Sequence, residues 1–381
     1  MKRNLIILIF IGVFITVACN NTKPEENGIK IIEIDLDQAK HINLTEWFDS
    51  IQLIPLETND QSLIATKNYA SISEDSIYIY DQKMHCILVF DHNNGKFIKT
   101  TSHLIGQGPN EYISINDFDI DERNGDILLL SSGVFTINRY NANLELTNKY
   151  KLTHDLIPYG VFKSISNDIF LFINGKEEDE ELINVFSVKE NKVIKKTCPS
   201  VMGVVTKTWS SLYYFIENKD QLSLVTTVPY SYIYRFDSTK LEFSPKVEFK
   251  IKQNRSFDIL PKQDRAYYNR LFNSQEYAFI TDILENKRYF LTTIRYRGKA
   301  FTNRYDKVSG KSQIFEYQYS DTRELFYAKL IDDDALYVFR DLEHISPLSN
   351  SSFLDDKYKK MIGNASEDDN PFIIKFFFKD F

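Results

Sequence analysis

Apolar residues in this chain occur in short runs that return in pairs from residue 77 to the C-terminus. In each pair, a first run rich in Ile, Leu, Tyr and Phe precedes a second run that ends in an aromatic residue, often with Asp or Asn directly after it. Short runs of this composition predict β-strands, because β-branched and aromatic side chains favour the pleated conformation. The first runs begin at Ile77, Ile127, Ile169, Leu222, Tyr289 and Leu336, and the terminal aromatic residues are Phe90, Tyr140, Phe186, Phe236, Tyr305 and Phe376.

The six pairs of predicted strands form a sequence repeat. The terminal aromatic residues follow one another at intervals of about 50 residues at first and of about 70 at the end. Repeats of roughly this length built from β-hairpins are typical of β-propeller blades. Runs such as residues 127–130 are apolar at consecutive positions, which indicates strands covered on both faces. The sequence therefore predicts an all-β fold, a six-bladed β-propeller over residues 29–381.

Two insertions account for the longer intervals. One covers about residues 254–278 and the other residues 341–371, and each contains a stretch with helical character. The sixth unit ends at Phe381 with no room for an outer strand, and a sheet with an unpaired edge is prone to aggregate. We therefore expect an N-terminal strand to complete this blade and close the ring, either residues 29–36 or residues 51–56.

The first 18 residues differ from the rest of the chain. Lys2 and Arg3 precede an apolar stretch, residues 5–18, which has the length of a signal-peptide core and is too short to span a bilayer. The stretch ends in Thr-Val-Ala-Cys at residues 16–19, which resembles a lipobox, the site at which a signal peptidase cuts before a lipidated cysteine. An ordinary secretory signal with a chance cysteine is the alternative.

On the lipobox interpretation, residues 1–18 are a signal peptide, Cys19 carries the lipid, and residues 19–28 are a flexible tether. We then expect the protein in the cell envelope, lipid-anchored to the outer membrane on its periplasmic or its outer face. The other two cysteines, Cys86 and Cys198, lie in units that are not adjacent, so we expect both to be buried and unpaired.

Charge and motif spacing narrow the chemistry. The net charge is −7, and the basic residues are scattered, which disfavours nucleic acid as a partner. The six histidines show no metal-ligand spacing. Asp117-x-Asp119-x-Asp121 lacks the glycine and the final acidic residue of a calcium loop, so we expect a strand that leads into a hairpin at Asn124-Gly125. The sequence predicts neither a cofactor nor a resident metal.

Glu111 and Tyr112 are the first candidates for ligand binding. They end the motif Gly-Gln-Gly-Pro-Asn-Glu-Tyr at residues 106–112, an irregular turn between the first and second units. In propellers, a loop from an outer strand to the next inner strand lies on the face that opens into the central channel, where both side chains could touch a ligand. The alternative is that the turn only positions the next blade.

Arg295, Arg297 and Trp209 are the second group of candidates. Residues two apart in a strand share one face, so Arg295 and Arg297, with Arg304 nearby, could bind the carboxylates of an acidic sugar. Trp209 could stack on a sugar ring. The alternatives are a solvated face paired with local acids for the arginines and a place in the core for the tryptophan.

Three stretches, residues 53–58 (Leu-Ile-Pro-Leu-Glu-Thr), residues 106–112 and residues 369–372 (Asp-Asn-Pro-Phe), resemble lipoprotein-anchored six-bladed β-propellers related to the NHL and TolB-like families. Together with the lipobox, the resemblance covers nearly the whole chain. Asn110 departs from it, since the family usually has a small residue there. The resemblance implies the fold and export. It implies no reaction, because this group has no general set of catalytic residues.

These observations favour a binding or interaction role. The sequence contains no Gly-x-Ser-x-Gly elbow, no His-Glu-x-x-His and no P-loop. We hypothesise an envelope lipoprotein that binds a glycan fragment, a peptide or an envelope protein. One alternative is a calcium-dependent hydrolase or lyase in the central channel, with an ion near Glu111, Asn116 and Asp117. Another is a structural partner of an outer-membrane assembly, for which a broad apolar patch would be the sign.

Overall fold

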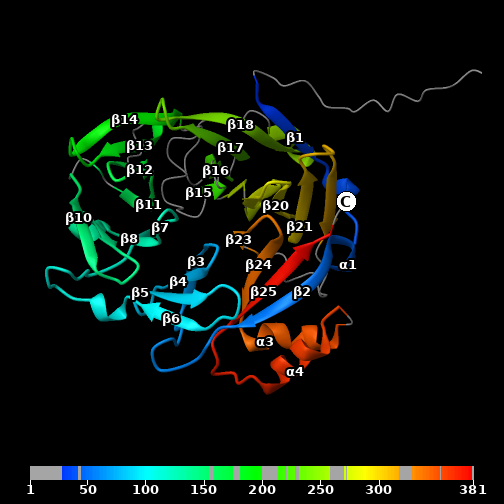
Figure 1. Ribbon diagram of the computed structural model, residues 1–381. Helices are drawn as coiled ribbons and strands as arrows, with labels where there is room; N and C mark the ends of the chain where they lie inside the picture. The colour runs from blue at the N-terminus through cyan, green and yellow to red at the C-terminus, as the bar shows by residue number, and fades with distance from the viewer. Residues whose placement is uncertain are drawn as a thin grey trace, which may run out of the picture.

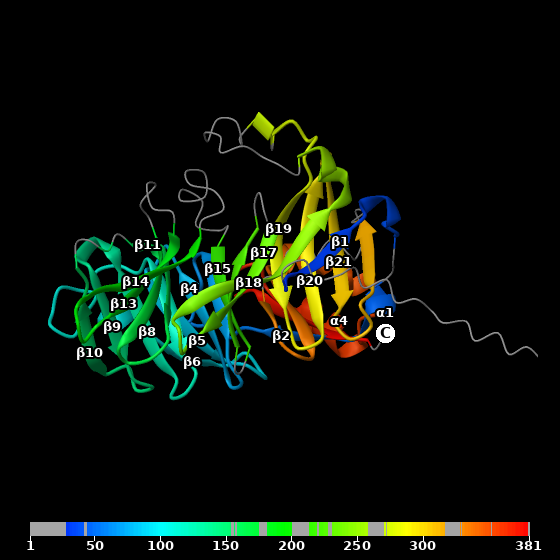
Figure 2. The same cartoon turned by 90° about the horizontal axis from the view of Figure 1, so that it is seen from above.

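The structure is a computed structural model that describes residues 28–41, 44–153, 156, 158–174, 181–199, 213–218, 221–227, 231–257, 270–271, 273–316, 328, 330–351 and 353–379. Its strands form six sheets of four or five strands each, arranged as blades around a central axis (Figure 1). Figure 2 shows the same ring from the side. The prediction of an all-β, six-bladed propeller is confirmed.

The strands of each blade are given from the inside outwards. Blade one comprises β3 (Lys67–Ile72), β4 (Ser76–Asp81), β5 (Cys86–Asp91) and β6 (Phe97–Thr100). Blade two comprises β7 (Asp117–Asp121), β8 (Asp126–Ser131), β9 (Thr136–Tyr140) and β10 (Leu146–Lys151). Blade three comprises β11 (Pro158–Ser164), β12 (Ile169–Asn174), β13 (Glu181–Ser187) and β14 (Lys192–Pro199).

The remaining blades include the two N-terminal strands. Blade four comprises β15 (Tyr213–Asn218), β16 (Gln221–Thr226), β17 (Ser231–Asp237), β18 (Glu242–Ile251) and β1 (Lys30–Ile34). Blade five comprises β19 (Phe279–Glu285), β20 (Tyr289–Tyr296), β21 (Lys299–Asp306) and β22 (Ser312–Glu316). Blade six comprises β23 (Leu330–Ile331), β24 (Ala335–Arg340), β25 (Phe372–Phe378) and β2 (Phe48–Pro55).

Consecutive strands within a blade are antiparallel, so the connections fall on two faces of the ring. One face carries the loops from the second to the third strand and the loops from the outer strand to the next blade. We call it the upper face. The lower face carries the hairpins between the first and second strands and between the third and fourth strands. Both helical insertions belong to connections of the upper face. The insertion at residues 341–371 lies between the second and third strands of blade six, and the insertion at residues 254–278 leads from blade four to the inner strand of blade five.

The repeated aromatic residue and the polar residue after it have separate structural roles. Phe90, Tyr140, Phe186 and Phe376 are fully buried between the sheets. The polar residue makes the turn between the third and fourth strands, because its side chain accepts backbone N–H groups two and three residues further on. Asp91 accepts from Asn93 and Asn94 at 2.9 and 3.0 Å; Asp237 accepts from Thr239 and Lys240 at 3.0 Å; Asp306 accepts from Val308 and Ser309 at 2.7 and 3.0 Å.

The ring is closed by the N-terminal part of the chain. β2 pairs antiparallel with β25 over the full length of that strand and forms the outer strand of blade six. Of the two segments that the sequence allowed for this place, residues 51–56 therefore supply the closing strand. The earlier segment forms β1, which pairs in parallel with β18 and adds a fifth strand to blade four. The expectation of closure by an N-terminal strand is confirmed.

Short helices decorate the outside of the ring. The insertion at residues 341–371 contains α3 (Leu342–Ile345), η8 (Ser346–Asn350) and α4 (Asp356–Asn364), and its apolar residues pack on β2 and on α1 (Leu44–Trp47). The other insertion begins with η6 (Lys252–Phe257), and residues 258–269, which include most of the stretch with helical character, fall outside the described residues. Other 3-10 turns in the described residues are η1 (Leu36–Gln38), η2 (Ser102–Leu104) and η3 (Ser132–Val134). Within the described ranges, every helix is too short or too polar to cross a bilayer.

Candidate functional site

Four blades carry a basic residue directly before the repeated aromatic residue of the third strand. These residues are Arg139, Arg235, Arg304 and Lys375. Each of the four contacts an element beyond its own blade. Arg235 bonds both carboxylate oxygens of Glu285 in blade five, at 2.5 and 2.8 Å, and the ammonium of Lys375 lies 3.4 Å from His92 of blade one. This recurring position therefore joins neighbouring blades.

Arg304 shows that such a residue belongs to the interior. It is 1% exposed, and its guanidinium lies over the ring of Trp47, 4.6 Å from the centroid, and donates to Gln313 at 2.8 Å. Burial lowers the pKa of Arg304 to about 10. The sequence analysis considered Arg304 as part of a surface cluster with Arg295. That expectation is wrong for Arg304, because its side chain points into the contact with the N-terminal α1.

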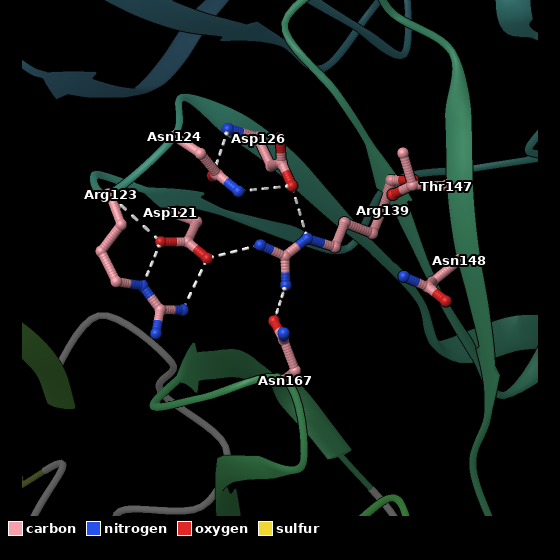
Figure 3. A pocket seen from close by; sticks show the side chains of 8 residues that line it. All are labelled: Asp121, Arg123, Asn124, Asp126, Arg139, Thr147, Asn148 and Asn167. Atoms are coloured by element: carbon pink, nitrogen blue, oxygen red, sulfur yellow. Dashed lines mark hydrogen bonds and ion pairs between the residues drawn. The ribbon is translucent and has the colours of Figure 1, made fainter.

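The same position in blade two lines an open pocket. Arg139 projects from β9 towards blade three, and a cavity of about 290 Å³ lies around it on the lower face (Figure 3). The lining comes from the hairpin between β7 and β8, from β9 and β10, and from the first turn of blade three. It consists of Asp121, Arg123, Asn124, Asp126, Arg139, Thr147, Asn148 and Asn167. All eight side chains are polar, and we refer to this cavity as the polar pocket.

Three side chains hold the guanidinium of Arg139 at the base of the polar pocket. Its Nη2 lies 2.5 Å from Asp121 and its Nε lies 2.6 Å from Asp126, and its Nη1 donates to the amide oxygen of Asn167 at 2.6 Å (Figure 3). Arg139 is 4% exposed, so these contacts are largely shielded from water. A buried guanidinium with three such partners has fixed geometry. The floor of the pocket is therefore rigid.

Charge is balanced across the pocket. Arg123, at the mouth, binds both oxygens of Asp121 at 2.6 and 2.7 Å, so two guanidinium groups face the carboxylates of Asp121 and Asp126. Burial alone would raise the pKa of Asp121, but the hydrogen bonds and charges of Arg123 and Arg139 outweigh it and lower that pKa below its usual 3.8. Both acids of this set are bound to cations, and the pocket carries no excess charge.

The remaining groups of the pocket are available to a ligand. Asn148 and Asn167 are exposed, and no partner is found for the side-chain amide of Asn148 among the described residues. Thr147 donates its hydroxyl to the main-chain oxygen of Arg139 at 3.1 Å, which leaves its lone pairs free to accept. Amide groups both donate and accept, and each carboxylate oxygen accepts more than one hydrogen bond. The pocket can therefore match a ligand with several adjacent hydroxyl groups.

A second polar cluster lies on the inner strands of blades two to four. The ammonium of Lys163 lies 2.7 Å from Asp119 and 2.7 Å from Glu217, and so joins three blades around the channel. Asp117 accepts the backbone N–H of Phe162 at 2.9 Å, and loss of water around this carboxylate raises its pKa well above the usual 3.8. These side chains satisfy backbone groups along the unpaired edge of β11, which is a structural task.

The acidic residues that the sequence analysis compared with a calcium loop lie in a strand. Residues 117–121 are the strand β7, and its hairpin turns at Asn124 and Gly125, as the sequence predicted. In the described part of the chain, no three His, Cys, Asp or Glu side chains are placed to hold a metal ion. Cys86 and Cys198 are both free and buried, as expected.

The side chains of Glu111 and Tyr112 contact their own turn and its neighbouring loops. Glu111 accepts the N–H of Gly108 at 2.7 Å. Tyr112 is 2% exposed, and its hydroxyl contacts Thr101 at 2.8 Å and the main-chain oxygen of His85 at 3.0 Å. A Cβ atom on Gly106 would lie 1.9 Å from the Glu111 carboxylate, which explains the glycine there. These contacts agree with the alternative in which the motif positions the next blade.

Arg295 and Arg297 do not share a strand face, which corrects the sequence analysis. Arg295 lies in β20, but that strand ends at Tyr296, and Arg297 and Gly298 form the hairpin turn with φ of 50° and 72°. The turn redirects Arg297, whose guanidinium lies over the ring of Tyr296, 4.9 Å from its centroid. Trp209 and Cys19 fall outside the described residues.

Sequence reasoning missed the residues of the polar pocket. One signal was present, because Arg139 stands at the same repeat position as Arg235, Arg304 and Lys375. The repeat alone does not tell which acids or amides of the neighbouring blade each of them meets. Asn148 and Asn167 carried no signal, since isolated asparagines are common in turns and outer strands.

Comparison with solved structures finds proteins of similar fold. The structure of a protein from Bacteroides fragilis NCTC 9343 that is described as exported is similar with a TM-score of 0.68 and 15% identity, over 92% of this chain and 100% of that one. A member of the DUF4221 family from Bacteroides vulgatus is similar with a TM-score of 0.55 and 13% identity, over 88% and 98% of the two chains. At these identities the likeness concerns the fold. No curated protein matches the chain.

One family of sequences covers almost the whole ring. Its model matches residues 29–377, which run from the start of β1 to the penultimate residue of β25. The matched region includes all six blades and excludes the leader and the tether that the sequence predicts. The chain therefore belongs to the family described as Domain of unknown function (DUF4934).

Proposed function

We propose that the protein binds a neutral, polyhydroxylated ligand, such as a glycan fragment, in the polar pocket between blades two and three, and that it acts as a binding protein of the cell envelope. The observation that carries this proposal is the charge balance of the pocket around the guanidinium of Arg139, which three side chains hold in place. The pocket is rigid, polar and without net charge, and it lies at the junction of two blades. The contacts of Arg139 already join these blades, so the other groups of the pocket have no structural task.

Charge argues for the neutral class of ligand. A ligand carboxylate or phosphate would approach the carboxylates of Asp121 and Asp126, and the two guanidinium groups beside them are already paired with these acids. A ligand cation would approach Arg123 and Arg139. A hydroxylated ligand avoids both repulsions, because each hydroxyl donates to a carboxylate and accepts from an amide.

Size supports the same class. A volume of about 290 Å³ lies at the lower end of the range for small-molecule sites, and it suits one or two sugar rings rather than a folded partner. Thr147 and Asn148 come from β10, the outer strand of blade two, so one wall of the pocket faces solvent and a longer glycan has room to continue outwards.

The envelope part of the proposal is supported by the leader and by the lipobox that ends at Cys19. The similar protein from Bacteroides fragilis is itself described as exported. We expect metabolic labelling with a fatty acid to modify the wild-type chain, and Cys19→Ala to abolish the label and release the protein from membranes. A labelled Cys19→Ala variant would contradict lipidation at that residue.

A glycan array followed by calorimetric titration tests the binding site. We expect neutral glycans to bind, and Asn148→Ala to weaken binding about tenfold, because the change removes one or two hydrogen bonds to the ligand. The matched control is Lys149→Ala, since Lys149 is the next residue of β10 and points to the other face of the sheet. Selective binding of acidic glycans, or equal affinities for wild type and Asn148→Ala, would exclude the pocket as the site.

A further inference from the structure

We propose that the junction of blades four and five holds a binding site for a phosphate group, formed by Lys30, Arg235 and Lys307 around the carboxylate of Glu285. Lys30 begins β1, Arg235 lies near the end of β17, Glu285 ends β19, and Lys307 follows β21. All four positions belong to the lower half of the ring, and we call the four side chains the basic cluster. The polar pocket lies at another junction, so the two proposals are independent.

Glu285 holds two of these cations next to each other. Its side chain is almost fully buried, and one carboxylate oxygen, Oε1, accepts from Arg235 at 2.5 Å and from Lys307 at 2.6 Å. The other oxygen accepts from Arg235 at 2.8 Å. The guanidinium and the ammonium are therefore neighbours, although they come from adjacent blades. Their side chains are 21% and 22% exposed, so a solute can reach them from solvent.

Two stacked aromatic rings bring the third cation to the same place. The ammonium of Lys307 lies 4.2 Å from the centroid of the Phe290 ring, and that of Lys30 lies 4.8 Å from the centroid of the Tyr305 ring. These two rings stack on each other, with their centroids 6.2 Å apart. Lys30 has no carboxylate partner among the described residues. The face of an aromatic ring attracts its ammonium but does not neutralise the charge.

The basic cluster carries an excess of positive charge. Three cations surround one carboxylate, so two positive charges have no counter-charge within the cluster. The polar pocket is built differently, because the guanidinium groups of Arg123 and Arg139 face the two carboxylates of Asp121 and Asp126. The whole chain has a net charge of −7, so the excess in the cluster is local. A local excess of positive charge attracts anions.

Three carboxylates that are close to the cluster in the sequence have other partners or point elsewhere. Asp306, at the end of β21, is bound to Arg288 at 3.2 Å. Asp237, at the end of β17, accepts backbone N–H groups of its own turn. Glu33 is exposed and lies on the face of β1 opposite to that of Lys30, because the two are an odd number of residues apart in a strand. These carboxylates therefore leave the excess charge of the cluster in place.

A phosphate monoester matches the cluster in charge and in hydrogen bonding. It carries about −1.5 to −2 charges at pH 7 and three acceptor oxygens, whereas a carboxylate carries one charge and two oxygens. The ammonium of Lys30 offers three N–H groups, and the bonds of Arg235 to Ser223 and Glu285 use three of its five. Burial lowers the pKa of Lys307, and the two neighbouring cations lower it further against the opposing effect of Glu285. A dianion bound between the cations offsets their mutual repulsion.

Calorimetric titration of the full mature chain with inorganic phosphate and with glycerol 3-phosphate tests the proposal. We expect one saturable site for both, with weaker binding at high salt and much weaker binding of acetate. Lys30→Met should lower the affinity at least about tenfold, because it removes one cation and leaves the hydrogen bonds of Glu285 in place, and Lys307→Met should do the same. Lys250→Met is the matched control and should bind like wild type, since Lys250 lies on β18 beside β1 but is exposed and pairs with Glu248 at 3.5 Å.

Four outcomes would overturn the proposal, once thermal denaturation has shown that each variant is folded. The first is the absence of saturable binding at millimolar phosphate. The second is a wild-type affinity in both cluster variants, or a loss in Lys250→Met equal to theirs. Acetate that binds as tightly as phosphate would make the cluster a carboxylate site instead. Adsorption to phosphatidylglycerol vesicles that Lys30→Met abolishes, without binding of glycerol 3-phosphate, would assign the cluster to the phosphodiester of a lipid headgroup.

Discussion

Individual side chains of β7 show how the surroundings of a carboxylate decide its effect on stability. Asp117 and Asp121 lie on the same face of this strand, four residues apart. Asp117 meets a backbone N–H and loses water, and its pKa is raised; Asp121 meets two guanidinium groups, and its pKa is lowered. The folded protein therefore binds a proton at Asp117 more tightly than the unfolded chain does, and binds one at Asp121 less tightly.

We predict opposite effects of removing the two charges. Asp117→Asn keeps an acceptor for Phe162, so it should raise the free energy of unfolding at pH 7, and the gain should shrink as the pH falls towards 3.8, the usual pKa of aspartate. Asp121→Asn should lower the free energy of unfolding at pH 7, and the loss should shrink only as the pH falls below 3.8. Urea denaturation between pH 3 and pH 8 measures both. Changes of the same sign at pH 7 would contradict this account.

At the scale of single elements, the hairpin between β5 and β6 illustrates contact between twisted blades. Gly95 in this hairpin has φ of 71°, and a Cβ atom there would lie 2.1 Å from the main-chain oxygen of Pro55, at the end of β2. The backbone N–H of Glu57 also donates to the oxygen of Gly95 at 2.9 Å. The hairpin of blade one thus rests directly on the strand that closes blade six.

Two glycines allow the effect of this contact on stability to be measured separately from that of backbone strain. Gly125, in the hairpin between β7 and β8, also has φ of 71°, but a Cβ atom there would meet nothing within 4 Å. We predict that Gly125→Ala lowers the free energy of unfolding by about 1 kcal/mol, the cost of a positive φ for alanine. Gly95→Ala should lower it by several times that amount, because β2 must also move away. Equal losses in thermal and urea denaturation would show that the contact with Pro55 matters little.

The elements also show which features a sequence can reveal. The aromatic residue and the Asp after it were visible because both act within one hairpin, as Asp91 and Asp306 do. The closing strand was harder to identify, since β1 and β2 are both short and apolar and both pair with an existing blade edge. Contacts between blades, such as Arg139 with Asn167, depend on how neighbouring sheets twist, which no local pattern encodes. The fold was therefore predictable and the polar pocket was not.

At the scale of the whole molecule, the N-terminal segment joins three blades from the outside. β1 extends blade four, Lys40 forms an isolated bridge with Phe315 of blade five, and β2 completes blade six. Trp47 lies between the last two, packed edge to face on Phe315 at 4.3 Å and covered by Arg304. The segment closes the ring and also covers the outer edges of its second half.

Two truncations should separate these roles. A chain that begins at residue 40 loses β1, whose Ile32 and Ile34 are buried, so we expect a lower melting temperature but one cooperative transition. A chain that begins at residue 57 also loses β2 and leaves the apolar edge of β25 unpaired, so we expect it to aggregate or to lack a cooperative transition. Calorimetry and light scattering measure both. A monomeric chain 57–381 with a sharp transition would show that β2 is dispensable for closure.

The pairing of β2 with β25 also sets the order in which the protein can assemble. β2 is among the first strands to leave the ribosome and β25 is the last, and their ladder joins Phe48 to Phe378. Blades one to five can form as their residues emerge, but β2 has no partner until residues 372–378 have been made. For all that time, an apolar strand near the N-terminus needs protection from other nascent chains. The newly made chain is therefore a natural client of chaperones until its final strand arrives.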